Sequence, residues 1–212
     1  MPTSILRLTQ KTLDDGIEEL RSKDRRLGRW IDRVGKVGLR RQRHQFGALC
    51  RSIIAQQLSS SAAKTIVGRF LKLFEPASKP DPAALLSIHN RKLRACGLSR
   101  QKLEYLKGIA REFRDGDLRR VRLGTMPDDE VIERLTRLRG VGVWTAEMFL
   151  IFSIGRRDVF SIGDLGLRTG VQRVEGRTLT HDEILHVAER WAPYRSVASL
   201  YLWKIAHWED TK

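Results

Sequence analysis

The spacing of apolar residues constrains the fold of this chain more than any other feature. Strictly alternating patterns, which indicate half-buried strands, are scarce along the sequence. Apolar residues recur instead at helical spacing, as in two clear stripes: Leu13, Ile17 and Leu20 in the first, and Phe46, Leu49, Ile53 and Ile54 in the second. The pattern predicts an all-α protein of about nine to eleven short helices.

Start signals for helices agree with this prediction. Asp81 followed by Pro82 places a capping carboxylate before a proline at the first helical position. Thr180 and Glu183 have the spacing of a capping box. The proline-rich stretch 76–82 is a candidate connection between two helical lobes, but it is too short to define independent domains. We therefore expect one bilobed helical domain over residues 1–212.

The charge of the chain indicates a polyanionic partner. Lys and Arg number 40 against 25 Asp and Glu, which gives a formal net charge of +15. DNA, RNA, ribosomes and anionic membranes fit this charge equally well, so composition alone gives only the class of partner. The arginine-rich stretch 21–43 is interrupted by apolar residues at helical spacing, which favours a folded basic face over a disordered tail: Leu27, Trp30, Ile31 and Val34.

Cysteine usage and hydropathy narrow the class of protein. Cys50 and Cys96 lie far apart and form no C-x-x-C pair, so we expect reduced thiols. An iron–sulfur cluster needs four cysteine ligands and is excluded. The longest apolar run, 148–152, is too short to cross a bilayer, and the first ten residues lack the pattern of a signal peptide. These features predict a soluble protein of the cytoplasm or nucleoid.

The most informative segment runs from Leu138 to Ala146. Gly140 and Gly142 predict a tight turn in which one helix ends at Gly140 and the next begins after Gly142. Unpaired backbone N–H groups at such a helix start hold a phosphate without help from side chains. A dinucleotide-binding turn is disfavoured, because Thr145 occupies the position of its third glycine.

Two motifs together resemble a known superfamily. The segment from Leu138 to Ala146 (L-x-G-V-G-x-x-T-A) resembles the helix-hairpin-helix signature of a DNA glycosylase superfamily, and 158–167 resembles its catalytic-aspartate segment. The resemblance covers about 46–208 and is closest to the 3-methyladenine DNA glycosylase II branch, whose helix end resembles 53–59. It implies a compact bilobed helical domain with the hairpin at about 130–154 and an active site in the cleft between the lobes.

The resemblance makes Asp164 the catalytic residue. Breaking an N-glycosidic bond leaves an oxocarbenium-like sugar, and a nearby carboxylate stabilises that charge or orients the attacking water. Asp164 also precedes a helical pattern, so sequence alone favours a helix N-cap, and the two roles are compatible.

Aromatic residues define the expected base pocket. Trp144 stands where strand-cleaving relatives carry a Schiff-base lysine, which implies a monofunctional enzyme. The resemblance places Trp144 and Trp203 on two sides of the base, and stacking on a cationic alkylated purine gains a cation–π contribution of about 1–2 kcal/mol. Met148 follows one turn after Trp144, where some relatives have an aromatic residue. The alternative is that both tryptophans are core residues.

The remaining site residues are expected contacts to DNA and to an ion. Base flipping leaves a hole in the duplex that a protein side chain must fill. The resemblance assigns this plug to Gln56, Gln57 and Leu58, and Gln57 is the residue expected to insert. Further expected DNA contacts are Gly140, Gly142, Thr145 and, more weakly, Arg195 with its neighbour Ser196. The resemblance also implies a structural sodium or potassium ion held by the backbone carbonyls of Thr136, Leu138 and Val141. No metal or other cofactor is expected to do chemistry, and His181 and His186 diverge around a helix and are expected at the surface.

These features predict a monofunctional DNA glycosylase. We expect it to act as a monomer on damaged double-stranded DNA, without a membrane, and to excise purines of the 3-methyladenine and 7-methylguanine type. Two alternatives stay open. One is a non-catalytic helix-hairpin-helix DNA-binding module, and the other is a glycosylase for oxidised guanine, uracil or mismatched thymine.

Overall fold

The computed structural model describes residues 7–209, and within them the chain is all-helical, as predicted. The strand-like pairing in this range is confined to an isolated antiparallel bridge between Arg7 and Arg156. The described residues form twelve α-helices, more than the nine to eleven expected. Two of the helices, α5 (Pro82–Ser87) and α6 (Asn90–Ala95), have only six residues each, which are too few to display an apolar period, although the start signal of α5 was recognised.

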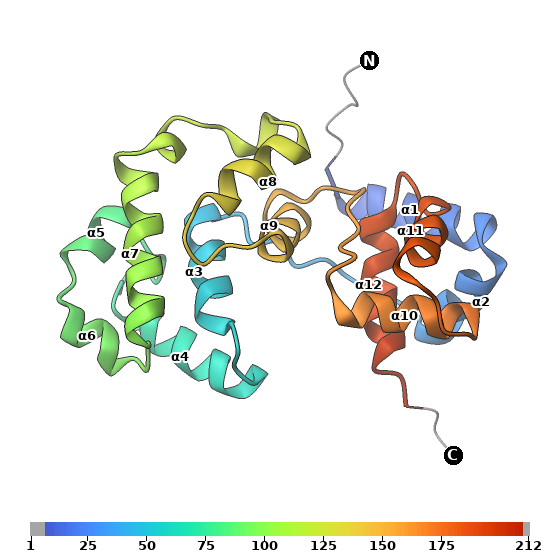
Figure 1. Ribbon diagram of the computed structural model, residues 1–212, viewed down its shortest axis with the longest axis horizontal. Helices are drawn as coiled ribbons and strands as arrows, with labels where there is room; N and C mark the ends of the chain where they lie inside the picture. Colours follow the sequence, from blue (N-terminus) through green and yellow to red (C-terminus); the bar gives the residue numbers. More distant parts are fainter. Residues whose placement is uncertain (1–6, 210–212) are drawn as a thin grey trace. The chain divides into compact units, whose positions relative to one another are not determined.

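The described helices divide between two compact units (Figure 1). Unit 2 spans Gln42–Phe149, and unit 1 is built from the described residues before Gln42 and after Phe149. Besides α5 and α6, unit 2 contains α3 (Gln45–Ala55), α4 (Ser60–Lys72), α7 (Arg100–Arg114), the 3₁₀ turns η1 (Asp117–Arg119) and η2 (Leu123–Thr125), α8 (Asp128–Thr136) and α9 (Val143–Phe149). Unit 1 contains α1 (Gln10–Lys23), α2 (Arg25–Val34), the π-helical turn η3 (Leu150–Ile154), α10 (Leu165–Glu175), α11 (His181–Glu189) and α12 (Arg195–Ala206).

Unit 1 closes around the apolar faces of its five α-helices. The predicted stripe of α1 turns inward, because Leu13 and Leu20 are buried in this core. A buried carboxylate joins the helices as well: Asp24 caps α2 by accepting from the Leu27 amide at 3.1 Å, and it also accepts from the Trp191 indole nitrogen at 2.9 Å. Burial of a charged group is costly unless it is hydrogen-bonded, and these bonds meet that need.

Unit 2 is organised around α3, which contacts α4, α7 and α9. The second predicted stripe is buried as expected, with Leu49, Ile53 and Ile54 fully enclosed. Phe46 at the start of α3 packs against Phe113 of α7 with ring centroids 5.4 Å apart. Burial of Ile53 and Ile54 anchors the last turn of α3, which is followed by the predicted plug residues 56–58.

The proline-rich stretch 76–82 does not divide the chain into its two units. It lies inside unit 2, where it connects α4 to α5. Pro80 is buried, and a Cβ atom on Gly47 of α3 would lie 3.3 Å from the Pro80 ring. The segment has the composition of a linker, yet packing of Pro80 on α3 makes it part of a unit, and that contact is invisible in the local sequence.

Several local predictions are confirmed. Asp81 caps α5 with Pro82 at its first position, and Thr180 forms a capping box with Glu183 at the start of α11. The arginine-rich stretch is helical up to Val34, where it forms the end of α1 and all of α2, and Leu27 and Ile31 are buried on its inner side. His181 and His186 are exposed on α11. Cys50 and Cys96 are free and buried, and burial raises the pKa of both thiols.

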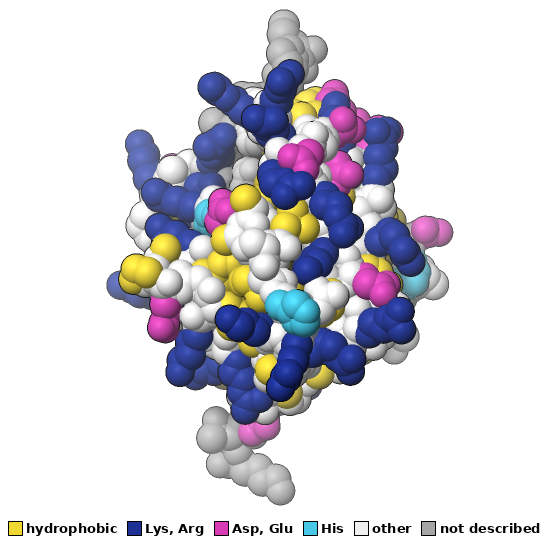
Figure 2. All heavy atoms as spheres, turned by 90° about the vertical axis from the view of Figure 1, so that its left-hand side faces the viewer, with side chains coloured by type: hydrophobic (Ala, Val, Ile, Leu, Met, Phe, Trp, Pro, Cys, Tyr) yellow, Lys and Arg dark blue, Asp and Glu magenta, His cyan; other side chains and the backbone are white. Residues whose placement is uncertain are grey.

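Basic side chains cover much of the described surface. Figure 2 shows a face on which Lys and Arg side chains are spread widely and outnumber the Asp and Glu side chains. In unit 2 exposed basic residues lie on α4, α6 and the start of α7, and others lie along 111–122 and in the hairpin loop: Lys64, Arg69, Lys72, Arg91, Lys92, Arg94, Arg100, Arg111, Arg114, Arg119, Arg120, Arg122, Arg137 and Arg139. None of the helices in residues 7–209 combines the length and the apolar character needed to cross a membrane.

His44 is a titratable helix cap and is expected to make the stability of unit 2 dependent on pH. Its Nδ1 atom accepts a hydrogen bond from the Gly47 amide at 3.2 Å and so caps α3. Desolvation, together with the charges of Lys79 and Arg51, lowers the pKa of His44 below its usual value. A lowered pKa in the folded state means that the cap contributes fully above the unfolded pKa of about 6.5 and is lost as the pH falls further.

We expect His44→Asn to remove this dependence, because asparagine caps helices without titrating near neutral pH. The melting temperature of the wild-type protein should fall relative to the variant between pH 7.5 and pH 5.5, by the equivalent of up to about 1 kcal/mol. A constant difference between the two proteins across this range would contradict the assignment.

Candidate active site and DNA-binding hairpin

The predicted hairpin is formed by α8, the loop 137–142 and α9. The first helix ends at Thr136, four residues before the Gly140 boundary expected from sequence. The loop after it is held by its own contacts: Leu138 and Val141 are buried, and the Val141 amide donates to the Leu138 carbonyl at 3.0 Å. Both side chains therefore enter the core of unit 2 from the loop and not from the helix.

The two glycines of the hairpin loop differ in their backbone conformation and in the space around them. Gly140 has a φ of +89°, and a Cβ atom there would lie 2.3 Å from the ring of Tyr105 on α7. Glycine is therefore required at this position both by conformation and by space. Gly142 has no positive φ, and a Cβ atom there would meet nothing within 4 Å. Its Cβ direction opens onto the surface at the start of α9.

The end of α3 is hydrogen-bonded to the hairpin loop and to α7. The Gln56 side-chain amide donates to the Gly140 carbonyl at 2.8 Å. Lys102 of α7 donates to the carbonyls of Ile54 and Gln56 at 2.8 and 2.6 Å, and desolvation lowers the pKa of this lysine. Lys102 and Tyr105 lie three residues apart on α7 and were missed by sequence reasoning, because nothing local marks them as neighbours of the hairpin.

The predicted plug residues separate into two kinds. Gln56 is half-buried and directed at the hairpin, as its bond to Gly140 requires. Gln57 has a positive φ of 56° and is exposed, and Leu58 is 38% exposed. An exposed side chain is free to enter another surface. Gln57 and Leu58 therefore have the accessibility that a wedge needs. Their role in DNA stays a prediction.

Helix α9 presents its residues in two directions. Trp144 is 45% exposed and Met148 is half-buried, one turn further along. Thr145 is only 3% exposed and faces the inside of unit 2. The exposure of Trp144 disfavours its reading as a simple core residue, whereas the burial of Thr145 favours a packing role in the hairpin.

Asp164 is the N-cap of α10, as the simpler interpretation of the sequence predicted. Its Oδ1 atom accepts from the Leu167 amide at 2.8 Å, and the residue is 9% exposed. The same Oδ1 atom accepts from the indole nitrogen of Trp203 on α12 at 3.0 Å. The structure thus brings together two residues that were predicted separately, the candidate catalytic carboxylate and a candidate pocket tryptophan.

A glycine allows this pairing. A Cβ atom on Gly166 would lie 3.0 Å from Trp203 Cδ1 and 3.2 Å from Asp164 Oδ1. Phe152 packs against the other part of Trp203, with ring centroids 5.5 Å apart. Gly166 was not singled out from the sequence, although a glycine inside the first turn of a helix is a weak signal of close approach.

Arg195 and Ser196 hold the segment that leads to Asp164. Arg195 donates from Nε to Asp158 Oδ1 at 2.7 Å and from Nη2 to Asp158 Oδ2 at 3.0 Å. The Ser196 hydroxyl accepts from the Val159 amide at 2.9 Å. These contacts favour a supporting role for both residues, since the Arg195 guanidinium already binds a carboxylate in two places.

The carbonyls proposed for a monovalent cation lie in the hairpin loop and at its edge. The Leu138 carbonyl accepts one hydrogen bond, from Val141, and a carbonyl oxygen has two lone pairs. The donor set is neutral and consists of oxygen atoms alone, which suits a hard cation. The ion stays a prediction for Thr136, Leu138 and Val141. Among the described residues, no cluster of His, Cys, Asp and Glu is arranged to bind another metal.

Comparison with known proteins identifies the family. The model of the HhH-GPD superfamily of base excision DNA repair proteins matches residues 50–193, which include the hairpin and Asp164. The chain belongs to the HhH-GPD superfamily. A relative from Schizosaccharomyces pombe, DNA-3-methyladenine glycosylase 1, is 34% identical over 172 residues, which are 80% of this chain and 75% of that protein.

Two solved structures of HhH-GPD relatives have a closely similar fold. The DNA-3-methyladenine glycosidase of Bacillus halodurans has a TM-score of 0.80 at 36% identity, and the match covers 90% of this chain and 88% of that one. The 3-methyladenine DNA glycosylase of S. pombe, solved in complex with abasic DNA, has a TM-score of 0.79 at 32% identity, with 93% and 99% covered. The helical fold is therefore that of the HhH-GPD superfamily.

Proposed function

We propose that this chain is a monofunctional DNA glycosylase that excises alkylated purines from duplex DNA in base excision repair. The observation that carries the proposal is the buried Asp164 carboxylate, which caps α10 and accepts from Trp203 in a member of the HhH-GPD superfamily. The names of the relatives support the substrate class, since those compared above are 3-methyladenine DNA glycosylases or glycosidases.

The proposed chemistry needs little from the protein beyond a fixed negative charge. A purine methylated at N3 or N7 is cationic and leaves without a general acid, and departure of the base leaves positive charge on the sugar. Asp164 stabilises that charge or orients the water that attacks the sugar. Because its Oδ1 atom is held by Leu167 and Trp203, the carboxylate requires no reorganisation as the charge develops.

The proposed partner is damaged double-stranded DNA, bound by a monomer. The net charge of +15 supports a polyanionic partner, and the S. pombe relative was solved with abasic DNA. Gly142 and the amides that follow it are the proposed phosphate contact, with Gln57 and Leu58 as the plug of the flipped base. Trp144 and Met148 are the proposed base contacts from α9. The location of the active site in a cleft between the lobes stays a prediction.

The reaction should stop at an abasic site. Trp144 occupies the position of the hairpin lysine of strand-cleaving relatives, so no amine is available there for a Schiff base. The test is a panel of duplexes, each with one damaged base: 3-methyladenine, 7-methylguanine, hypoxanthine, ethenoadenine or 1-methyladenine. We expect alkali-labile abasic sites to appear where an alkylated purine has been excised. Borohydride should trap no covalent adduct.

Two results would overturn parts of this proposal. A stoichiometric borohydride adduct would show a lyase and would contradict the assignment of Trp144. Tight DNA binding without excision of any base in the panel would favour the non-catalytic helix-hairpin-helix module instead.

A further inference from the structure

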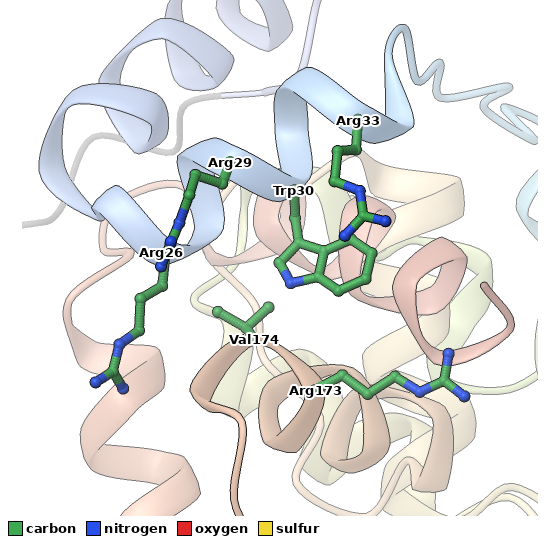
Figure 3. Close-up of a pocket in the computed structure, with 6 residues that line it drawn as sticks. All are labelled: Arg26, Arg29, Trp30, Arg33, Arg173 and Val174. Carbon is green, nitrogen blue, oxygen red and sulfur yellow. The ribbon is translucent and has the colours of Figure 1, made fainter. Parts of the chain in front are cut away.

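A pocket in unit 1 has a lining that contains none of the candidate active-site or DNA-binding residues described above. It has a volume of about 270 Å³ and lies between α2 and α10 (Figure 3). Its lining carries four guanidinium groups, one indole and one aliphatic side chain, and no carboxylate: Arg26, Arg29, Trp30, Arg33, Arg173 and Val174. The arginine-rich stretch noted in the sequence therefore forms one wall of a cavity.

Arg26 and Arg173 are both bonded to other parts of the protein. Arg26 forms an ion pair with the buried Glu175, which also binds Arg190. Arg173 donates through Nη1 to the carbonyls of Ile205 and Trp208, at 2.8 and 2.7 Å. Both bonds use one nitrogen, so the other N–H groups of Arg173 make no hydrogen bond with the described residues.

Arg29 has no partner among the described residues. It is exposed on α2, one turn before Arg33, and its guanidinium makes neither an ion pair nor a hydrogen bond within residues 7–209. An arginine that lines a cavity without a carboxylate keeps its five donors for a ligand. The donors that stay available for a ligand are therefore those of Arg29 and the remaining N–H groups of Arg173.

Trp30 gives the pocket a fixed wall. In Figure 3 the indole points from α2 towards Val174 of α10, and the Arg33 guanidinium lies against it, 4.8 Å from the ring centroid. The Trp208 ring packs edge-on against Trp30 at 6.0 Å. Stacking on an aromatic face restricts a guanidinium to few orientations, so less freedom is lost when it binds an anion.

We propose that this pocket binds a phosphate group, at a site separate from Asp164. Guanidinium groups bind phosphate through paired N–H donors, and no carboxylate in the lining competes for them. Water occupies about 30 Å³ per molecule, so the cavity holds a phosphate with part of an attached sugar. Arg173 follows Asp164 by nine residues along α10, which places the pocket about 14 Å from the carboxylate along the helix.

Phosphate of this kind has two sources, a DNA backbone or a free phosphorylated small molecule. The first test uses the whole chain labelled with 5-fluorotryptophan and titrated with sodium phosphate at constant ionic strength. Trp30→Phe assigns the Trp30 signal. We expect this signal to shift saturably, and Arg29→Gln to weaken the binding about tenfold, the effect of one charge-assisted hydrogen bond. Arg25→Gln is the matched control, because it removes an exposed charge from the same helix outside the pocket.

The second test identifies the source. Affinity for an undamaged duplex is measured at several salt concentrations for the wild-type protein, Arg29→Gln and Arg25→Gln. If the pocket holds a backbone phosphate, the log–log salt slope of Arg29→Gln should fall by about 0.9, the value for one lost phosphate contact, and that of Arg25→Gln should not. An unchanged slope with a saturable Trp30 shift supports a free phosphorylated molecule.

The proposal is overturned if phosphate shifts Trp30 equally in the wild-type protein and Arg29→Gln, or if neither the Trp30 signal nor the salt slope responds. Arg29 is exposed and makes no hydrogen bond or ion pair within residues 7–209, so its replacement should leave the melting temperature nearly unchanged. The tests do not depend on excision, so they can fail while the function proposed for Asp164 holds.

Discussion

Replacing Asp164 with asparagine is expected to lower single-turnover excision of an alkylated purine by at least about 100-fold, the scale for loss of one preorganised electrostatic group. Both the Leu167 amide and the Trp203 indole donate to Oδ1, and an asparagine carbonyl can accept both bonds. Asparagine is also a good N-cap. The substitution therefore removes the charge and keeps the cap.

The melting temperature and the choice of base decide the interpretation. The variant should melt close to the wild-type protein and bind DNA at least as well, since it loses a negative charge. The loss of rate should be smaller on 7-methylguanine, a cationic leaving group, than on neutral hypoxanthine. A well-folded variant with near-normal rates on both bases would mean that Asp164 only caps α10. Trp203→Phe, which removes the indole donor and keeps an aromatic ring, should lower the rate less.

Gly140→Ala is expected to destabilise the protein by about 3 kcal/mol. A residue with a side chain at positive φ costs about 1–2 kcal/mol, and overpacking adds about 1–3 kcal/mol. Both apply, because φ is +89° and the new Cβ atom would lie 2.3 Å from the Tyr105 ring. For a chain of this size the melting temperature should fall by about 6–12 °C. Thermal unfolding followed by circular dichroism measures the change.

Gly142→Ala is the matched control and separates folding from DNA binding. Its Cβ atom meets nothing within 4 Å in the protein, so the melting temperature should stay within about 2 °C of the wild-type value. If the amides at the start of α9 bind a phosphate, the added methyl group obstructs only the DNA, and affinity should fall about tenfold. Equal loss of stability in the two variants would contradict the different roles assigned to the glycines. Unchanged affinity in a stable Gly142→Ala protein would remove this turn from the DNA contact.

The local features of the fold were predictable because they depend on residues within one or two helical turns. The apolar stripes of α1 and α3 and the caps at Asp81 and Thr180 are encoded at separations of three or four residues. The helix count was too low and the first hairpin helix too long. Short helices such as α5 and α6 lack a readable period, and α8 ends at Thr136, before the buried Leu138 that the prediction from sequence had placed in the helix.

By itself, the sequence determined the helical class, the hairpin turn, the basic character and the position of Asp164 at a helix start. Only the tertiary structure decided which of these residues act together. Trp203 binds Asp164 from 39 positions away, and Gln56 binds Gly140 from 84 positions away. It also brought Arg29 of α2 and Arg173 of α10 into the lining of one pocket. Periodicity fixes which face of a helix is apolar, but contacts between distant helices depend on how those faces pack, and no local spacing records that choice.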